Sequence, residues 1–315
     1  MFRSSLRLAA AAFYRIGYKL HHKFFLQPQQ PVHTPVIIIG SYLVGGAGKT
    51  PFTIWLAKHF QEQGKKVAVL CHTAAWDEFL MLQQEFQNST EQGTPSHITH
   101  KIKLFKTGNR YRTAAEIQDK FDIILCDDGF EDSRFTGATR ICLDWEEPPT
   151  SWTKLLPAGP FRSLKQDHDE RGIIHLDCNP KKCEKNAEPP CIQFSVESLT
   201  NFTPGTALNA TVICGIGSPK RFIDDILAFS RIAATSKIHI ENSIIRRDHD
   251  KHFLQTVQNV LSQNKDIIIT QKDACRLPQT LLTHPQLHIA IQKTNVSENA
   301  KRMIDARLHR HDVFP

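Results

Sequence analysis

The first 25 residues of this 315-residue chain lack acidic side chains, and they lack an apolar run long enough to span a bilayer. Their longest uncharged stretch is Leu8–Tyr14, and basic residues recur on both sides of it. No small-residue cleavage site follows a clean apolar core either. We therefore expect neither a membrane-spanning helix nor a secretory signal peptide in this segment.

Cysteine is also sparse, with 8 residues and no C-x-x-C pair. Cys126, Cys142 and Cys214 lie inside apolar, strand-like runs. This pattern favours reduced thiols in a cytosolic protein over a disulfide framework. The spacing of three further cysteines is wrong for a zinc knuckle and favours a plain loop: Cys178, Cys183 and Cys191.

The chain carries an excess of positive charge. Its 39 Lys and Arg residues exceed its 32 Asp and Glu residues, which gives a net charge of +7. Such a balance suggests an anionic partner, for example a nucleotide, a phosphorylated substrate or a phospholipid surface. The basic residues are spread along the chain and no aromatic-basic motif occurs, so we expect no nucleic acid partner.

The N-terminal segment has helical periodicity. Its apolar residues fall on one broad face, with basic residues around it: Phe2, Leu6, Ala9, Phe13, Ile16 and Leu20. This pattern is typical of a helix that lies on an anionic membrane surface. It is equally typical of a helix that packs on its own domain, and periodicity alone does not decide between the two.

After a proline-punctuated linker, apolar β-branched runs alternate with amphipathic segments. This alternation predicts an α/β fold with a mostly parallel sheet and helices on both faces. The expected strands are Val36–Ile39, Lys66–Leu70, Phe121–Cys126, Thr139–Leu143, Thr211–Cys214, Asp266–Thr270 and Leu287–Ile291. The expected helices include Pro51–Gln63, Asp77–Phe86, Phe222–Ser230 and His252–Gln263.

The stretch "VIIIGSYLVGGAGKTPF", residues 36–52, has the order of a phosphate-binding loop: strand, glycine-rich turn, Lys-Thr and helix. In such a loop the backbone N–H groups surround the phosphates, the lysine reaches the β- and γ-phosphates, and the hydroxyl binds Mg²⁺. The loop residues here are Gly45, Gly46, Ala47, Gly48, Lys49 and Thr50. The usual pattern would place glycine where Leu43 stands, so the strict motif fails by one residue. The alternative is a tight strand-to-helix turn without a ligand.

A second nucleotide-site element follows in "FDIILCDDGF". Asp127 and Asp128 come directly after an apolar run, as expected of acidic residues that hold a metal ion beside a phosphate loop. Two adjacent carboxylates repel each other, which favours a nearby cation. An Asp-Asp-Gly turn that caps an ordinary strand is the alternative.

The segment from Cys178 to Thr206 is rich in Pro, Lys and Asn and interrupts the alternation. We therefore expect four parts. Residues 1–30 form the amphipathic helix and a linker, residues 31–177 the P-loop core, residues 178–206 a variable linker, and residues 207–315 a smaller C-terminal α/β subdomain that completes the active-site cleft.

These features allow more than one function. A P-loop nucleotide-binding switch or assembly ATPase, in which hydrolysis changes a partner, has the same motifs. A dinucleotide-binding protein built on "CGIGSPKRF" is weakly supported, because lysine stands where the third glycine would be.

Six phrases, in this order, resemble the tetraacyldisaccharide 4′-kinase family of lipid A biosynthesis. They are "GSYLVGGAGKTPF", "LCDDGFEDSRF", "LLPAGPFRS", "VICGIGSPKRFIDDI", "RRDHDKHF" and "IITQKDACRL". The resemblance extends from the N-terminal helix to about Leu277. It implies Mg²⁺-dependent transfer of the γ-phosphate of ATP to the 4′-hydroxyl of tetraacyldisaccharide 1-phosphate, giving lipid IV-A. It also implies a location at the cytoplasmic face of the inner membrane of a Gram-negative bacterium, on its anionic surface. We expect the protein to act as a monomer.

The resemblance also implies roles for particular residues. The family's "GDE" phrase aligns with "WDE", which places Asp77 at the catalytic aspartate and Glu78 beside it at the metal site. The "DH" phrase places His249 beside Asp77 as the second member of a base dyad. Arg162 of "LLPAGPFR" matches an arginine suited to phosphate binding. The matched loop gives Lys49 a catalytic role, and the matched metal ligands are Thr50, Asp127 and Asp128.

The chain departs from the family pattern in two places. The family continues after the second strand with a Ser-Arg-Gly-Tyr phrase and a long loop, whereas this chain has the shorter "CHTAAWDE", in which His72 stands nearest the missing arginine. The family's "DDGFQH" is here "DDGFED", with Glu131 and Asp132 in place of Gln and His. A catalytically impaired paralogue is therefore an alternative, although the retained Lys49 and Asp128 argue against it.

Overall fold

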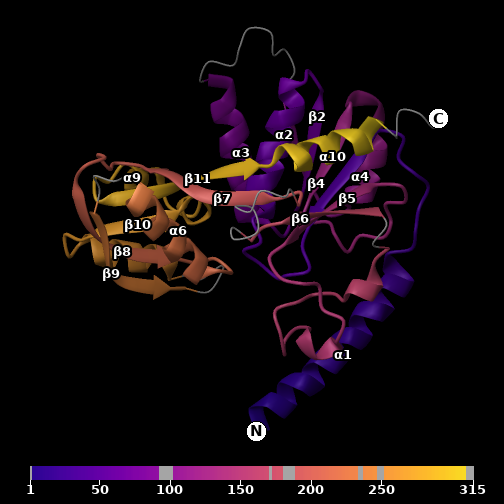
Figure 1. Ribbon diagram of the computed structural model, residues 1–315, viewed down its shortest axis with the longest axis horizontal. Coiled ribbons are helices and arrows are strands. Elements are labelled where there is room, and N and C mark those ends of the chain that lie inside the picture. The colour runs from indigo at the N-terminus through magenta and orange to yellow at the C-terminus, as the bar shows by residue number, and fades with distance from the viewer. Residues whose placement is uncertain are drawn as a thin grey trace. The chain divides into compact units, whose positions relative to one another are not determined.

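The computed structural model describes residues 2–91, 102–169, 172–179, 189–232, 237–246 and 252–309 (Figure 1). The chain divides into two compact units. Unit 1 comprises Met1–Gln193 and Asn295–Pro315, and unit 2 comprises Phe194–Thr294. His249, expected in the base dyad, lies outside the described residues.

Unit 1 is built on a six-stranded sheet of order β3-β2-β4-β1-β5-β6, in which every neighbouring pair is parallel. All five residues of β1 and β4 are buried, as parallel strands covered on both faces require. The strands are β1 Val36–Gly40, β2 Val67–His72, β3 Lys103–Thr107, β4 Ile123–Asp127, β5 Thr139–Asp144 and β6 Ile173–Asp177.

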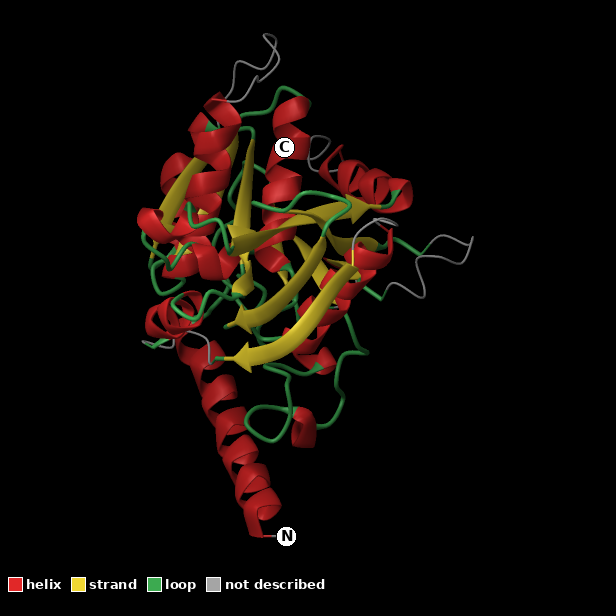
Figure 2. Ribbon diagram, turned by 90° about the vertical axis from the view of Figure 1, so that its left-hand side faces the viewer, coloured by secondary structure: helices red, strands yellow, loops and turns green. Residues whose placement is uncertain are grey.

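Helices alternate with the first four strands of unit 1 along the chain. Helix α2 buries Phe52, Leu56 and Phe60, which recur every four residues on one face. Figure 2 shows the helices in red and the strands in yellow. The helices are α1 Phe2–Phe25, α2 Lys49–Glu62, α3 Trp76–Glu91, α4 Arg110–Ile117 and α10 Glu298–His309, with short 3₁₀ turns η1 Gln118–Lys120, η2 Trp152–Lys154 and η3 Lys165–Asp167.

Unit 2 contains a five-stranded sheet of order β7-β11-β10-β8-β9. Alternate residues of its strands point to opposite faces: Val212 packs in a cluster with Phe222 of α6, and Ile213 packs with Phe253 of α7. Its elements are β7 Ile192–Leu199, β8 Ala207–Cys214, α6 Pro219–Ile232, β9 Lys237–Ile245, α7 Phe253–Leu261, β10 Asp266–Thr270, α8 Gln271–Ala274, α9 Gln279–Leu282 and β11 Leu287–Val296.

This architecture confirms the α/β fold expected from the sequence. All seven expected strands are present, as β1, β2, β4, β5, β8, β10 and β11. Four further strands were not expected, and each lies at the edge of a sheet: β3, β6, β7 and β9.

Helix α1, Phe2–Phe25, is one straight helix whose first residues lie at the N label in Figure 2. The apolar face expected from the sequence is exposed, with Phe13 75% and Ile16 56% accessible. A different face, which includes the fully buried Ala11, is covered. In the part of the chain that the structure describes, no helix is both long and apolar enough to cross a membrane.

Candidate active site

The expected phosphate loop joins β1 to α2 at the carboxyl end of the sheet. Gly45, Gly46 and Gly48 have φ values of 72°, 62° and 81°, a left-handed conformation that glycine adopts without a steric penalty. Gly48 is the N-cap residue of α2, so Lys49 and Thr50 begin the helix. The loop therefore has the backbone path that lets N–H groups converge on an anion at a helix N-terminus.

The first acidic residue is linked to this helix through two hydroxyl groups. Thr50 Oγ1 donates to Asp127 Oδ2 at 3.0 Å, and Thr53 Oγ1 donates to Asp127 Oδ1 at 2.9 Å. Asp127 ends β4, which pairs with β1, and its side chain is buried. Thr50 and Asp127 are 77 residues apart in sequence. The phosphate loop and the acidic motif after β4 are thus in direct contact.

The second acidic residue lies among basic groups. Asp128 Oδ1 is 3.5 Å from Lys49 Nζ and 3.0 Å from a guanidinium nitrogen of Arg162. Asp128 has a φ of 54°, a left-handed conformation that is uncommon outside glycine. The structure therefore brings Lys49, Asp128 and Arg162 together.

Arg162 belongs to the connection that follows β5, and this connection pairs with the phosphate loop. Arg162 N donates to Tyr42 O at 3.0 Å, and Val44 N donates to Pro160 O at 3.0 Å. Leu43, which replaces the first glycine of the usual motif, forms an isolated β-bridge with Phe161. The leucine is thus used to attach the arginine-bearing segment to the loop.

The pKa values of the two aspartates are shifted in opposite directions. Burial raises the pKa of Asp127, and the charge of Asp128 raises it further. Partial burial opposes ionisation of Asp128 too, but the charges of Lys49, Arg162 and Arg110 lower the pKa of Asp128 overall. A divalent cation beside Asp127 would remove this conflict, because it favours the ionised form of both carboxyl groups.

Glu131, one of the departures from the family pattern, is part of this cluster. Burial raises the pKa of Glu131, and the guanidinium of Arg162, 3.5 Å away, offsets this only in part. The Ser163 hydroxyl donates to Glu131 Oε1 at 3.4 Å. Asp132, the other departure, is instead paired with Arg134 at 2.7 Å.

Arg110, which the motif analysis did not identify, lies beside the site together with His72 of the shortened segment. Arg110 at the start of α4 donates to Asp127 O at 2.9 Å. Burial lowers the pKa of His72, the charge of Arg110 lowers it further, and Asp128 opposes both effects. Arg110 follows β3, a strand that was not predicted, so no sequence pattern placed it at this edge.

Asp77 and Glu78 lie in the first turn of α3, which follows β2. Asp77 is 0% exposed, and its Oδ1 accepts the N–H of Glu78 at 3.1 Å. β2 is the other neighbour of β4, so α3 begins at the same carboxyl edge as the phosphate loop.

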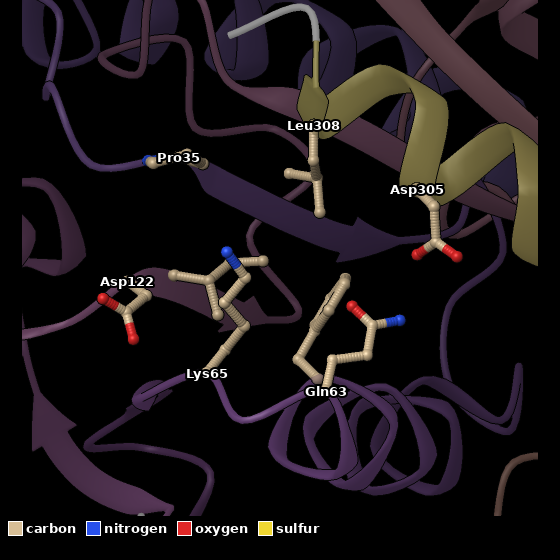
Figure 3. A pocket seen from close by; sticks show the side chains of 8 residues that line it. Pro35, Gln63, Lys65, Asp122, Asp305 and Leu308 are labelled. Carbon is tan, nitrogen blue, oxygen red and sulfur yellow. The ribbon is translucent and has the colours of Figure 1, made fainter. Parts of the chain in front are cut away.

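A small pocket lies at the opposite, amino end of the same strands (Figure 3). Asp305 and Leu308 of α10 point toward Gln63 and Lys65 there. None of the expected site residues lines it; its lining is Pro35, Phe60, Gln63, Lys65, Asp122, Ile123, Asp305 and Leu308. This pocket is therefore separate from the phosphate loop.

The donor set at the loop fits Mg²⁺. Thr50, Asp127 and Asp128 offer a hydroxyl and two carboxylates, the oxygen ligands that Mg²⁺ prefers. Burial and the neighbouring Asp128 carboxylate raise the pKa of Asp127, and a bound divalent cation would favour its ionised form.

A parallel sheet, a glycine-rich loop, a Lys-Thr helix start and an acidic residue on the adjacent strand define a P-loop phosphotransfer protein. The sequence model described as tetraacyldisaccharide-1-P 4′-kinase (LpxK) matches residues 4–309. The chain therefore belongs to the tetraacyldisaccharide-1-P 4′-kinase family, a family of kinases.

Individual relatives agree with this assignment. The chain is 26% identical over 335 residues to the tetraacyldisaccharide 4′-kinase of Herminiimonas arsenicoxydans, covering 94% of this chain and 88% of that protein. It is 23% identical to the Chlamydia caviae protein of the same name, covering 87% and 80%. The crystal structure of "apo" form LpxK from Aquifex aeolicus in complex with ATP shares the fold, with a TM-score of 0.65, 17% identity and 99% of each chain covered.

Proposed function

We propose that this chain transfers the γ-phosphate of ATP to the 4′-hydroxyl of tetraacyldisaccharide 1-phosphate, which gives lipid IV-A. The observation that carries the proposal is the joined cluster of Lys49, Thr50, Asp127, Asp128 and Arg162 in a chain of this kinase family. A kinase needs positioned cations and N–H groups around the transferred phosphoryl group, and this cluster supplies them.

Each residue of the cluster has a distinct task. The N–H groups of residues 45–48 and Lys49 bind the β- and γ-phosphates. Arg162 grips a phosphate oxygen, for which a guanidinium is better suited than an ammonium group. Asp128 pairs with both of these cations, 3.5 Å from Lys49 and 3.0 Å from Arg162.

Thr50, Asp127 and Asp128 hold Mg²⁺, with Glu78 as a further ligand. When bound, Mg²⁺ supplies charge neutralisation for the phosphate oxygens. Thr53 orients the Asp127 carboxylate through its hydroxyl, 2.9 Å away. The proposed metal site thus draws its residues from α2, the end of β4 with the residue after it, and the start of α3.

The acceptor hydroxyl loses its proton to a base formed by Asp77 and His249. The buried position of Asp77 at the start of α3, on the carboxyl side of the sheet, supports this role. For His249 the support is the family phrase "RRDHDKHF" around it. A histidine assisted by a carboxylate accepts a proton near neutral pH.

The exposed apolar face of α1 brings the enzyme to its lipid. Leu6, Phe13, Ile16 and Leu20 are exposed, with basic residues beside them, as expected of a helix on an anionic bilayer surface. A lipid acceptor dissolved in a membrane requires such an approach. We therefore place the protein at the cytoplasmic face of the inner membrane, as a monomer.

Acceptor specificity tests this function. The protein is incubated with ATP, Mg²⁺ and tetraacyldisaccharide 1-phosphate in mixed micelles, and the lipid product is identified by mass spectrometry. A matched acceptor that lacks the 4′-hydroxyl is the control. We expect one added phosphoryl group on the first acceptor and none on the second. ATP hydrolysis with no lipid product would instead favour the switch ATPase.

A further inference from the structure

Helix α1 has a second, inner face that packs against the segment carrying Arg162. Residues of this face are spaced three or four apart: Ala11, Tyr14, Arg15, Tyr18 and His22, all of them buried or partly buried. The exposed Phe13 and Ile16 belong to the other face. One helix therefore presents two faces, and only the outer face is available to a membrane.

The inner face is bonded to the main chain of Arg162 itself. Tyr14 OH donates to Arg162 O at 2.8 Å. The Tyr14 ring packs on an apolar cluster that includes Tyr42 and Phe161, the residues through which this segment meets the phosphate loop. Tyr14 therefore contacts both the main chain of Arg162 and the apolar cluster that attaches this segment to the phosphate loop.

A second contact fixes the same segment a few residues later. The guanidinium of Arg15 makes two hydrogen bonds to the carboxylate of Asp167, and both side chains are largely buried. Asp167 Oδ2 also accepts the N–H of Leu164 at 2.9 Å. Burial opposes ionisation of Asp167, but these bonds lower its pKa overall. The ion pair thus attaches α1 to this segment at Asp167, five residues after Arg162 in the sequence.

The contacts of Tyr14 and Arg15 matter because Arg162 lies in a connection without regular strands. The segment from Trp152 to Asp167 contains only short 3₁₀ turns, at its two ends. A guanidinium that must bind a phosphate has to be held in one place before the phosphate arrives, and a long side chain on an irregular connection does not achieve this alone.

We infer that Tyr14 and Arg15 are positioning residues that hold Arg162 over the phosphate loop. The helix that carries the outer apolar face is thereby also a structural part of the phosphate site. This inference rests on the proposed function, because Arg162 is taken to bind a phosphate of ATP. Neither Tyr14 nor Arg15 is assigned a direct contact with substrate.

The test uses two pairs of matched variants in the full-length protein. Tyr14→Phe removes only the hydroxyl that bonds Arg162 O. Tyr111→Phe is its control, since Tyr111 OH donates to Gln30 O at 3.0 Å and lies away from Arg162. Arg15→Gln removes the ion pair, and Arg112→Gln is its control, since it breaks an exposed ion pair to Glu116 on α4, 2.9 Å long. Thermal unfolding of each variant checks that it is folded.

Phosphate transfer and ATP affinity are measured for every variant. We expect Tyr14→Phe to lower kcat/KM for ATP about threefold to tenfold and Arg15→Gln about tenfold, as loss of one or two buried bonds would. The controls should stay within about twofold of the wild type. Binding to anionic vesicles should be unchanged for Tyr14→Phe, which separates positioning from membrane contact.

A double-mutant comparison shows whether the effect passes through Arg162. In an Arg162→Ala background, Tyr14→Phe should have no further effect on ATP affinity or transfer. If Tyr14→Phe matches Tyr111→Phe, or if its effect persists in the Arg162→Ala background, the inference is wrong. If the wild type transfers no phosphate, the proposed function fails, while the ATP affinities still decide the role of Tyr14.

Discussion

The phosphate-binding part and the proton-accepting part of the proposed site differ in how they are built. The first is joined by direct contacts between α2, β4 and the Arg162 segment, all within unit 1. The second depends on Asp77 in α3 and on His249, which the sequence places between the ends of unit 2. Phosphate binding is thus assembled from contacts within unit 1, whereas the proposed base combines Asp77 with a residue outside the described part of the chain.

This difference indicates where the chain tolerates change. The departures from the family pattern at "CHTAAWDE" and "DDGFED" adjoin the site, yet Thr50 still contacts Asp127, and Lys49 still pairs with Asp128. His72 and Arg110 place positive or polar groups at the edge where the family arginine is missing. We therefore expect substitutions in the phosphate-binding part to change mainly kcat/KM for ATP. Substitutions in the proton-accepting part should change mainly kcat.

The largest effect is expected for Lys49→Ala. Removing the ammonium group takes a cation from the transferred phosphate and leaves Asp128 without one of its partners. We expect kcat/KM for ATP to fall about 10³-fold. Lys58→Ala is the control, since Lys58 lies on the same helix but pairs with Glu85 at 3.0 Å. Equal losses in the two variants would contradict the assignment of the loop.

A somewhat smaller effect is expected for Asp77→Asn. The amide keeps the shape of the side chain but accepts no proton, so kcat should fall roughly 10²-fold. ATP affinity should stay within about threefold, because the phosphate-binding part is untouched. Glu85→Gln, also on α3, should leave both quantities near their wild-type values. If Asp77→Asn lost ATP affinity and kept kcat, the separation of the site into a phosphate-binding part and a proton-accepting part would be contradicted.

Thr53→Val probes the metal side of the phosphate-binding part. The substitution removes the hydroxyl that donates to Asp127 at 2.9 Å while keeping the volume of the side chain. With that bond lost, the carboxylate is less well oriented and harder to ionise. The Mg²⁺ concentration for half-maximal transfer should rise about threefold to tenfold. An unchanged Mg²⁺ dependence would exclude this role for Thr53.

The smallest effect on activity is expected for Glu131→Gln. Burial raises the pKa of Glu131, so the folded protein favours its neutral form, which glutamine imitates. The stability that this protonation contributes is present at low pH and is lost as the pH rises through the raised pKa.

Glu131→Gln should therefore be more stable than the wild type at alkaline pH and nearly equal to it at acidic pH. Urea unfolding at both pH values measures the difference. Transfer activity should change less than about twofold. A variant that is less stable than the wild type at alkaline pH would show that Glu131 is ionised and stabilised by Arg162.

The interior of both sheets could be predicted from sequence, and the edges could not. Interior strands such as β1 and β10 are covered on both faces and are continuous apolar runs. Edge strands such as β3 and β9 carry lysine, histidine and asparagine among their apolar residues. Their sequences therefore lack the contrast with the surrounding loops that identifies an interior strand.

The same reason limits prediction of the site. Lys49, Thr50, Asp127 and Asp128 directly follow interior strands, so their positions could be inferred from the motif and the strand together. Arg110 follows the edge strand β3, and its contact with Asp127 O depends on strand order rather than on a local pattern. The bridge of Leu43 to Phe161 likewise joins segments more than a hundred residues apart.

The most direct test of the central claim is transfer of labelled γ-phosphate from ATP to tetraacyldisaccharide 1-phosphate in mixed micelles by the wild type and by Arg162→Ala. We predict a labelled lipid that depends on the 4′-hydroxyl and on Mg²⁺, and a rate about 10²-fold lower for the variant. A wild-type protein that binds ATP but leaves the lipid unlabelled would contradict the account.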